Sequence, residues 1–256
     1  MWKVVVLVPF ALDAEGMKNR SDQLNAVTLG PDIQFDFRPV KAGPDLYDSH
    51  HDMVMADISM FEAGCTAQAD GYDAVCIDTM SDSGANALRS VLDIPVISPA
   101  RTTFSLMLML GNKFGVLTQW DPWKKLYTKA AAEMNLQNHL VGIESINMPP
   151  DVRNLLGGKE EVVFPKLLDA GLRLVEKGAE AIVLGSTTMH QSAAFLAENL
   201  PVPVINPGPA TYKIAEAMLS LKLTHSHIAF PKPHNEKLGM LHAMQDGAAR
   251  YVADNS

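Results

Sequence analysis

Hydrophobic residues along the chain form short continuous runs of strand length, separated by segments in which apolar residues recur at the helical period. The runs have no polar alternation and lie at 4–8, 74–77, 95–97, 114–117, 181–184 and 202–205. The helical segments between them lie at 52–69, 84–92, 122–134, 161–177, 191–199 and 210–221. Strands that are apolar on both faces and alternate with helices are typical of parallel sheets covered on both sides. The pattern therefore predicts a doubly wound α/β fold.

One strand-and-helix unit occurs twice. "GYDAVCIDT" (71–79) and "GAEAIVLGS" (178–186) each place an acidic residue and Ala after the Gly, then apolar residues, then a hydroxyl eight residues after the Gly. The next strands, "IPVISP" (94–99) and "VPVINP" (202–207), also match. All α/β units share an alternation of apolar strands with helices, but the matched Gly, acidic residue, hydroxyl and PVI-x-P favour a duplication.

A duplication predicts two similar domains, residues 1–105 with about 212–256 and residues 106–211. Ligands of open parallel sheets bind beyond the carboxyl ends of the strands. Two such units facing each other bring their strand ends to one cleft. We therefore expect Thr79 to approach this cleft from one side and Ser186 from the other.

Composition and charge narrow the class of protein. The chain has 256 residues, of which 47% are hydrophobic and 20% charged, and its net charge is -8. This balance is typical of a globular protein, and the absence of a Lys/Arg cluster argues against a nucleic-acid or anionic-membrane surface. The apolar run at 4–8 is too short for a signal peptide, and no run reaches transmembrane length. Two cysteines, Cys65 and Cys76, make no disulfide framework, so a cytoplasmic location is expected.

Several motifs resemble one superfamily over essentially the whole chain. They are "DGYDAV" (70–75), "FGVLT" (114–118), "EAIVLGS" (180–186) and "LTHSHIAFPKP" (223–233). Together they resemble the aspartate/glutamate/hydantoin racemase superfamily, in which hydantoin and allantoin racemases look most similar. The resemblance implies two Rossmann-like domains related by pseudo-twofold symmetry, with the active site in the interdomain cleft.

The resemblance also implies where the catalytic residues lie. The two catalytic cysteines of the classical racemases fall on Thr79 and Ser186, and the usual Asn-Pro-Asn turn falls on Val8-Pro9-Phe10. A thiolate base is accessible near neutral pH, whereas an aliphatic alcohol is a far weaker acid. The two hydroxyls are therefore not equivalent to a pair of proton-transferring thiols.

Three interpretations of Thr79 and Ser186 stay open. Each hydroxyl caps a helix, or the hydroxyls and the amides behind them bind an anion, or Ser186 is an activated nucleophile that needs a nearby base. The segments "TMSDSG" (79–84) and "STTMH" (186–190) suit a carboxylate or carbonyl oxygen. The expected substrate-binding residues are Pro9, Phe10, Met80, Ser81, Ser83, Thr118, Thr187 and Thr188.

His190 and Asp82 are the candidate acid–base pair. His190 lies one turn beyond Ser186, and histidine titrates in the useful range. Asp82 lies three residues after Thr79 on the other side. His190 is equally typical of a solvated surface position, and Asp82 of a first helical turn favoured by the helix dipole. Asp78 points away from Thr79 if the alternation of the strand continues to it.

We expect a small-molecule enzyme that acts at a carbon next to a carboxylate or carbonyl, and the resemblance implies that this enzyme is a racemase or isomerase. A lyase, a hydratase, a hydrolase and a non-catalytic binding protein are the alternatives. No cofactor is expected, because no G-x-G-x-x-G follows a strand. No metal is expected, because the paired histidines of "HSH" (225–227) have no recognisable third ligand. The resemblance also implies a homo-oligomer.

Overall fold

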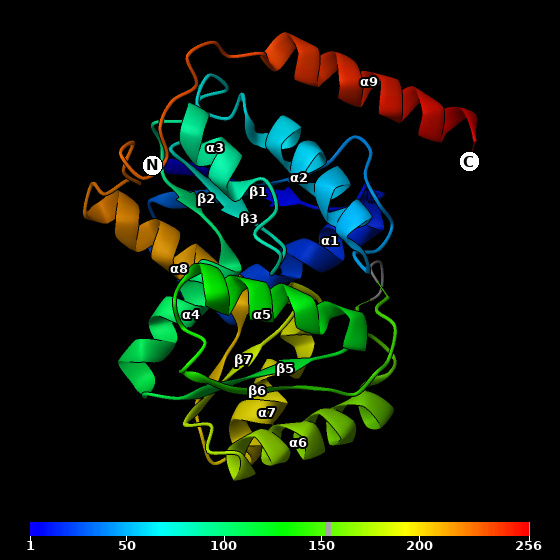
Figure 1. Cartoon of the computed structure of the whole chain (residues 1–256), viewed down its shortest axis with the longest axis vertical. Coiled ribbons are helices and arrows are strands. Elements are labelled where there is room, and N and C mark those ends of the chain that lie inside the picture. Colours follow the sequence, from blue (N-terminus) through cyan, green and yellow to red (C-terminus); the bar gives the residue numbers. More distant parts are fainter. Residues whose placement is uncertain (152–154, 256) are drawn as a thin grey trace.

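The computed structural model describes residues 1–151 and 155–255, and in this part of the chain two four-stranded parallel sheets form the framework (Figure 1). Residues 152–154 and 256, which fall within the predicted domains, lie outside the described residues. The first sheet has the order β2-β1-β3-β4 and the second the order β6-β5-β7-β8. The predicted α/β class is confirmed.

The strands of the first sheet are β1 (Trp2–Val8), β2 (Ile33–Pro39), β3 (Ala74–Ile77) and β4 (Val96–Ile97). The strands of the second sheet are β5 (Phe114–Thr118), β6 (Leu140–Ser145), β7 (Ala181–Leu184) and β8 (Val204–Ile205). Leu7 pairs with Ile77 at the end of β1, and Leu117 pairs with Leu184 at the end of β5. Within each sheet, the two central strands therefore end next to each other.

The described part of the chain contains nine helices. They are α1 (Ala14–Ser21), α2 (His50–Gly64), α3 (Ala85–Val91), α4 (Pro99–Leu110), α5 (Lys124–Glu133), α6 (Glu160–Glu176), α7 (Ala193–Asn199), α8 (Pro207–Ser220) and α9 (Leu238–Asp254). Short 3-10 helices span Asp22–Ala26, Asp121–Trp123 and Thr187–Ser192. Helix α9 lies on the outer side of the first half, where it packs on α2.

Helices α4 and α8 each leave one sheet and pack on the other. Helix α4 follows β4, yet its Phe104 and Met107 are buried against Phe114 of β5. Helix α8 follows β8, yet its Tyr212 is buried against Val6 of β1. The two helices lie side by side between the halves (Figure 1). The domain boundaries expected near residues 105 and 212 fall inside these helices and stay predictions.

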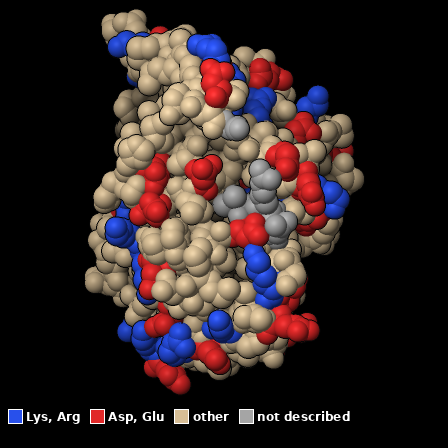
Figure 2. Space-filling model, turned by 90° about the vertical axis from the view of Figure 1, so that its right-hand side faces the viewer, with Lys and Arg blue, Asp and Glu red and all other residues tan. Residues whose placement is uncertain are grey.

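The surface and the helices bear on the expected partners. Figure 2 shows one face of the molecule, and on that face acidic and basic side chains are interspersed. Within residues 1–151 and 155–255, none of the helices has the length and hydrophobicity needed to cross a bilayer. The expectations of no nucleic-acid partner and of a cytoplasmic location stay predictions.

Candidate active site

The ends of β3 and β7 face one cavity between the two sheets. Seven of the residues expected at the site line it, namely Pro9, Phe10, Thr79, Met80, Ser186, Thr187 and Thr188. Parallel strands present their carboxyl ends at one edge of a sheet, and this geometry brings the two segments together although they are far apart in sequence.

The turns after β3 and β7 have the same local arrangement of hydroxyls. Thr79 Oγ1 lies 3.1 Å from Ser81 Oγ, and the Ser81 amide donates to Thr79 Oγ1 at 3.4 Å. Ser186 Oγ lies 2.7 Å from Thr188 Oγ1, and the Thr188 amide donates to Ser186 Oγ at 3.1 Å. Each strand end therefore presents two hydroxyls two residues apart.

Ser186 is also a helix cap. Its extended backbone and its bond to the Thr188 amide make it the N-cap of the 3-10 helix Thr187–Ser192. A capping serine that also lines a cavity keeps its hydroxyl oriented by the backbone. The cap interpretation and the anion-site interpretation of Ser186 are therefore compatible.

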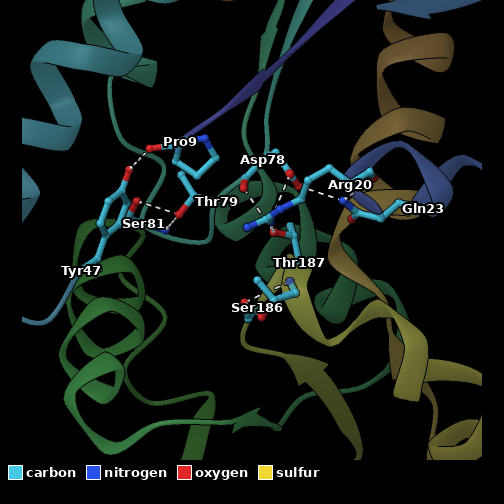
Figure 3. Close-up of polar contacts among 10 residues, drawn as sticks. Pro9, Arg20, Gln23, Tyr47, Asp78, Thr79, Ser81, Ser186 and Thr187 are labelled. Atoms are coloured by element: carbon cyan, nitrogen blue, oxygen red, sulfur yellow. Dashed lines mark hydrogen bonds and ion pairs between the residues drawn. The ribbon is translucent and has the colours of Figure 1, made fainter. Parts of the chain in front are cut away.

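A buried ion pair, Arg20 with Asp78, lies beside the two strand ends and was missed in the sequence. Both side chains are 1% exposed, and Arg20 Nη1 lies 3.2 Å from Asp78 Oδ2. Gln23 Nε2 donates to Asp78 Oδ1 at 3.1 Å, and Arg20 Nη1 donates to Thr187 Oγ1 at 3.1 Å. Figure 3 shows these contacts, of which the bond from Arg20 to Thr187 joins the two halves of the molecule.

Asp78 lines the cavity together with Thr79, and the expectation that its side chain points away from Thr79 stays a prediction. Burial raises the pKa of its carboxyl, while the Arg20 charge and the bond from Gln23 oppose that rise. Strand β3 ends at Ile77, so the alternation of the strand no longer determines the direction of the next side chain. Asp78 is a titratable carboxyl beside Thr79, on the wall that the first half supplies.

Two buried tyrosines line the cavity as well, one from each half. The Tyr47 hydroxyl donates to the Pro9 carbonyl at 3.2 Å, and the Tyr127 hydroxyl donates to the Gly185 carbonyl. Burial raises the pKa of both phenols well above their ordinary value. Both phenols are therefore neutral at physiological pH.

The remaining predicted binding residues support the walls from behind. Thr118 Oγ1 lies 2.8 Å from the Tyr127 hydroxyl, so Thr118 orients a side chain that lines the cavity. Ser81 Oγ lies 2.8 Å from Ser83 Oγ, which extends the hydroxyl chain of the first turn away from Thr79. These three residues act on the cavity through their neighbours.

Asp82 lies outside the cavity and caps a helix. Its carboxylate accepts bonds from Ser98 Oγ at 2.8 Å and from the amides of Ala100 and Arg101 at 2.9 and 3.0 Å. These amides are in the first turn of α4, which favours a negative group. The backbone of Asp82 has φ 53°, a left-handed turn that directs the side chain toward α4. Asp82 thus does not lie in a first helical turn as the alternative expected, but from outside the helix it binds the first turn of α4, where the helix dipole favours its charge.

His190 also lies away from the cavity, beside α1. Burial and the nearby Arg20 charge lower its pKa to about 4, although its bond to the Asn19 backbone opposes the shift. The imidazole is therefore neutral at pH 7. The structure does not bring His190 and Asp82 together across the cavity, and their proposed acid–base roles have no geometric support.

The two thiols take no part in the cavity. Cys76 is buried inside β3, where burial raises its pKa. Cys65 is buried at the end of α2, and its pKa is raised to about 11, chiefly by burial. Both thiols are protonated at neutral pH, and neither lies at a strand end. Within the described residues, no group of three or more His, Cys, Asp or Glu side chains is arranged to hold a metal ion.

Comparisons with a family model and with known proteins point to the same group of racemases. The family model described as Asp/Glu/Hydantoin racemase matches residues 16–215. A hydantoin racemase of Pseudomonas sp. (strain NS671) is 30% identical over 182 residues, which cover 71% of this chain and 72% of that protein. A hydantoin racemase of Rhizobium meliloti is 28% identical over 185 residues, covering 69% and 76%.

A solved structure shares the fold. The allantoin racemase from Klebsiella pneumoniae superposes with a TM-score of 0.82 over 92% of this chain and 95% of that chain, at 24% identity. At this identity the likeness shows a common architecture. The resemblance noted in the sequence is confirmed at the level of the family.

Proposed function

The chain belongs to the Asp/Glu/hydantoin racemase family of enzymes, and on this premise we propose that it is a racemase-like isomerase acting at a carbon next to a carbonyl or carboxylate group. One observation carries the proposal. The hydroxyl-bearing ends of β3 and β7, which come from the two halves of the chain, line one cavity. A reaction that removes a proton from a carbon next to a carbonyl needs donors that hold the carbonyl oxygen while its negative charge develops, and the two turns supply such donors.

We assign binding, and not proton transfer, to Thr79 and Ser186. The amides two residues later already donate to the two hydroxyl oxygens and help to orient them. The hydroxyl groups themselves suit the oxygen of a carbonyl or carboxylate, and such preorganised donors stabilise the charge that develops when the adjacent carbon loses its proton. An alcohol is too weak an acid to replace a thiol as the base. Asp78, which lies beside Thr79, is the carboxyl in the cavity whose raised pKa brings it closer to the operating pH.

We propose that the two halves arose by duplication and are related by pseudo-twofold symmetry. The matching strand orders of the two sheets and the matching turns after β3 and β7 support this proposal. We extend the proposal to a cofactor-independent reaction on a small molecule in the cytoplasm by a homo-oligomer. The domains would be residues 1–105 with about 212–256 and residues 106–211.

A second candidate is a binding protein that holds the same small molecules without turnover. The observation that favours it is that the described residues lining the cavity include neither a cysteine nor a histidine, which leaves Asp78 as the potential base among them. The two candidates differ in exchange chemistry. An enzyme labilises the substrate's α-proton, whereas a binding protein only gains stability from the ligand.

The test is exchange of the α-proton with solvent deuterium, followed by NMR. A panel of 5-substituted hydantoins, α-hydroxy acids and α-amino acids is incubated with the protein in D2O. Enzyme-dependent exchange that Asp78→Asn lowers at least 100-fold supports the isomerase and the role of Asp78. Thermal stabilisation by a panel member, with exchange no faster than in buffer, supports the binding protein instead.

A further inference from the structure

Arg20 is the charged residue buried most deeply beside the cavity, and averaged over the whole residue its exposed fraction is 0%. One of its nitrogens, Nη1, donates to Asp78 and Thr187. Its other two nitrogens, Nε and Nη2, are buried and have no hydrogen-bond partner among the described residues. A buried donor without an acceptor costs roughly 1–3 kcal/mol, and more when it is charged. The arrangement therefore leaves two donors of the Arg20 guanidinium buried without an acceptor.

The two free nitrogens lie on one edge of the guanidinium group. Nε–H and one Nη2–H point in parallel, and this edge is the fork that binds a carboxylate through two hydrogen bonds. Asp78 holds the far end of the group through Nη1 at 3.2 Å. The planar group is thus fixed in orientation before a ligand arrives.

The surroundings of Arg20 favour an anion. The guanidinium carbon lies 5.5 Å from the centre of the Phe10 ring, which shields one face from water. Arg20, Phe10 and Ser186 all line the cavity, and Figure 3 shows the Arg20 side chain extending from α1 to the space beside Asp78 and Thr187. In such a dry site a charged hydrogen bond is stronger than in water.

We propose that the Nε and Nη2 edge of Arg20 binds the carboxylate of the substrate, so that the cavity selects an anionic acid over a neutral amide or cyclic imide of similar size. The inference rests on the proposed function, because it takes this cavity as the active site. Arg20 is then the specificity-determining residue, and Thr79 and Ser186 are left to hold the remaining oxygen or nitrogen atoms of the substrate.

Replacing Asp78 tests the proposal, because the proposal predicts whether ligand binding becomes tighter or weaker. Its carboxylate and the carboxylate of a ligand compete for the same guanidinium. Asp78→Asn removes the competing charge, so the variant binds an acid more tightly than the wild type does. Arg20→Lys keeps the positive charge but removes the fork, so that variant binds the acid more weakly. A purely structural ion pair would make both variants change ligand binding in the same direction.

The probes are lactate and its neutral isostere lactamide, with 5-methylhydantoin as the cyclic imide. Binding is measured by calorimetry and by the shift of the melting temperature, with sodium chloride added to equalise ionic strength. We expect lactate to bind the wild type at least ten-fold more tightly than lactamide. We expect Arg20→Lys to weaken lactate binding at least ten-fold and Asp78→Asn to strengthen it at least three-fold. Arg38→Lys is the matched control, because Arg38 also pairs with an aspartate, Asp70, at 2.9 Å, away from the cavity.

The outcomes separate this proposal from the function. Equal binding of lactate and lactamide by the wild type, or no binding of either, overturns the role of Arg20 without any variant being needed. Exchange of the 5-methylhydantoin proton without lactate binding also overturns that role while leaving the isomerase intact. Lactate binding that depends on Arg20, with no α-proton exchange in any panel member, supports the carboxylate site and removes the isomerase.

Discussion

The two walls of the cavity are alike in their hydroxyls and unlike in their charge. Thr79 and Ser186 each accept a bond from the amide two residues later. The residue before Thr79 is Asp78, a buried carboxylate, whereas the residue before Ser186 is Gly185, whose carbonyl accepts the Tyr127 hydroxyl. The first wall is therefore charged and the second is neutral.

This difference shows how one backbone arrangement serves two purposes. The hydroxyl and amide of each turn come from the backbone path after a parallel strand, and both halves keep them. The charge depends on one side chain and on its partner, Arg20, which comes from α1. An asymmetric cavity of this kind orients a ligand, because an anion is favoured near Arg20 and not near Tyr127.

The largest expected effect comes from removing the cation of the charged wall. Arg20→Met leaves Asp78 buried without its partner, and breaking a buried pair in this way costs about 3–5 kcal/mol of unfolding free energy. The measurement is urea denaturation at pH 7. The double variant Arg20→Met with Asp78→Leu should recover much of the loss, since an apolar pair needs no partner. A loss below about 1 kcal/mol in the single variant would contradict this expectation, because it would be no larger than the contribution of a typical surface ion pair.

A second effect concerns His190, which follows the neutral wall in sequence but lies away from the cavity, and this effect depends on pH. His190 has a pKa of about 4 in the folded chain, below the ordinary 6.5. The unfolded chain therefore takes up a proton first as the pH falls, and stability present above pH 6.5 is lost between pH 6.5 and about 4. At roughly 1.4 kcal/mol per pKa unit the total is about 3 kcal/mol.

The variant His190→Gln should lack this pH-dependent loss. Unfolding free energies are compared at pH 7, 5.5 and 4.5, with the exposed His234→Gln as a control. Curves for the wild type and His190→Gln that stay parallel through this range would contradict a buried neutral imidazole.

A smaller effect tests why the second wall carries a glycine. A Cβ at Gly185 would lie 2.7 Å from the Tyr127 hydroxyl oxygen and 3.0 Å from Thr118 Cβ. Gly185→Ala therefore displaces Tyr127, and overpacking of this kind costs about 1–3 kcal/mol. The loss is measured by urea denaturation. The double variant Gly185→Ala with Tyr127→Phe, which removes the Tyr127 hydroxyl, should restore part of the lost unfolding free energy. An unchanged stability of Gly185→Ala alone would mean that Tyr127 moves aside without strain.

The smallest effect separates the two hydroxyls themselves. Ser186→Ala removes the N-cap of the 3-10 helix, which costs about 1 kcal/mol. Thr79→Val removes a hydroxyl that accepts a long bond, 3.4 Å, and begins no helix, so the expected loss is less than about 0.5 kcal/mol. Denaturation of both variants under one condition gives the comparison. Equal losses would show that the two turns are as alike in energy as they are in geometry.

The pattern of apolar residues was sufficient for the strands that are buried on both faces. Strands β1, β3, β5 and β7 are such strands, and all four were predicted. The edge strands β2 and β6 were missed because half-buried strands mix polar with apolar residues. The alternation in "IQFDFRP" (33–39) carried a strand signal that a search for continuous apolar runs overlooks.

The location of the cavity was predictable, but its charged residues were not. Thr79 and Ser186 follow apolar runs, and strand ends of parallel sheets meet by geometry. Arg20 lies in α1, whose sequence "AEGMKNRS" (14–21) looks like a solvated surface helix. Its burial depends on Asp78 and Thr187, which are remote in sequence. Such contacts exist only after the fold has formed.

Because α4 and α8 each pack on the sheet of the other half, the stability of each half depends on the other half being folded. Each sheet owes one covered face to a helix that follows a strand of its neighbour. If one half melted alone, it would withdraw that helix and expose the apolar face of a sheet that was still folded. Heat should therefore unfold the chain in one cooperative step, and calorimetry should record a single peak despite the presence of two sheets.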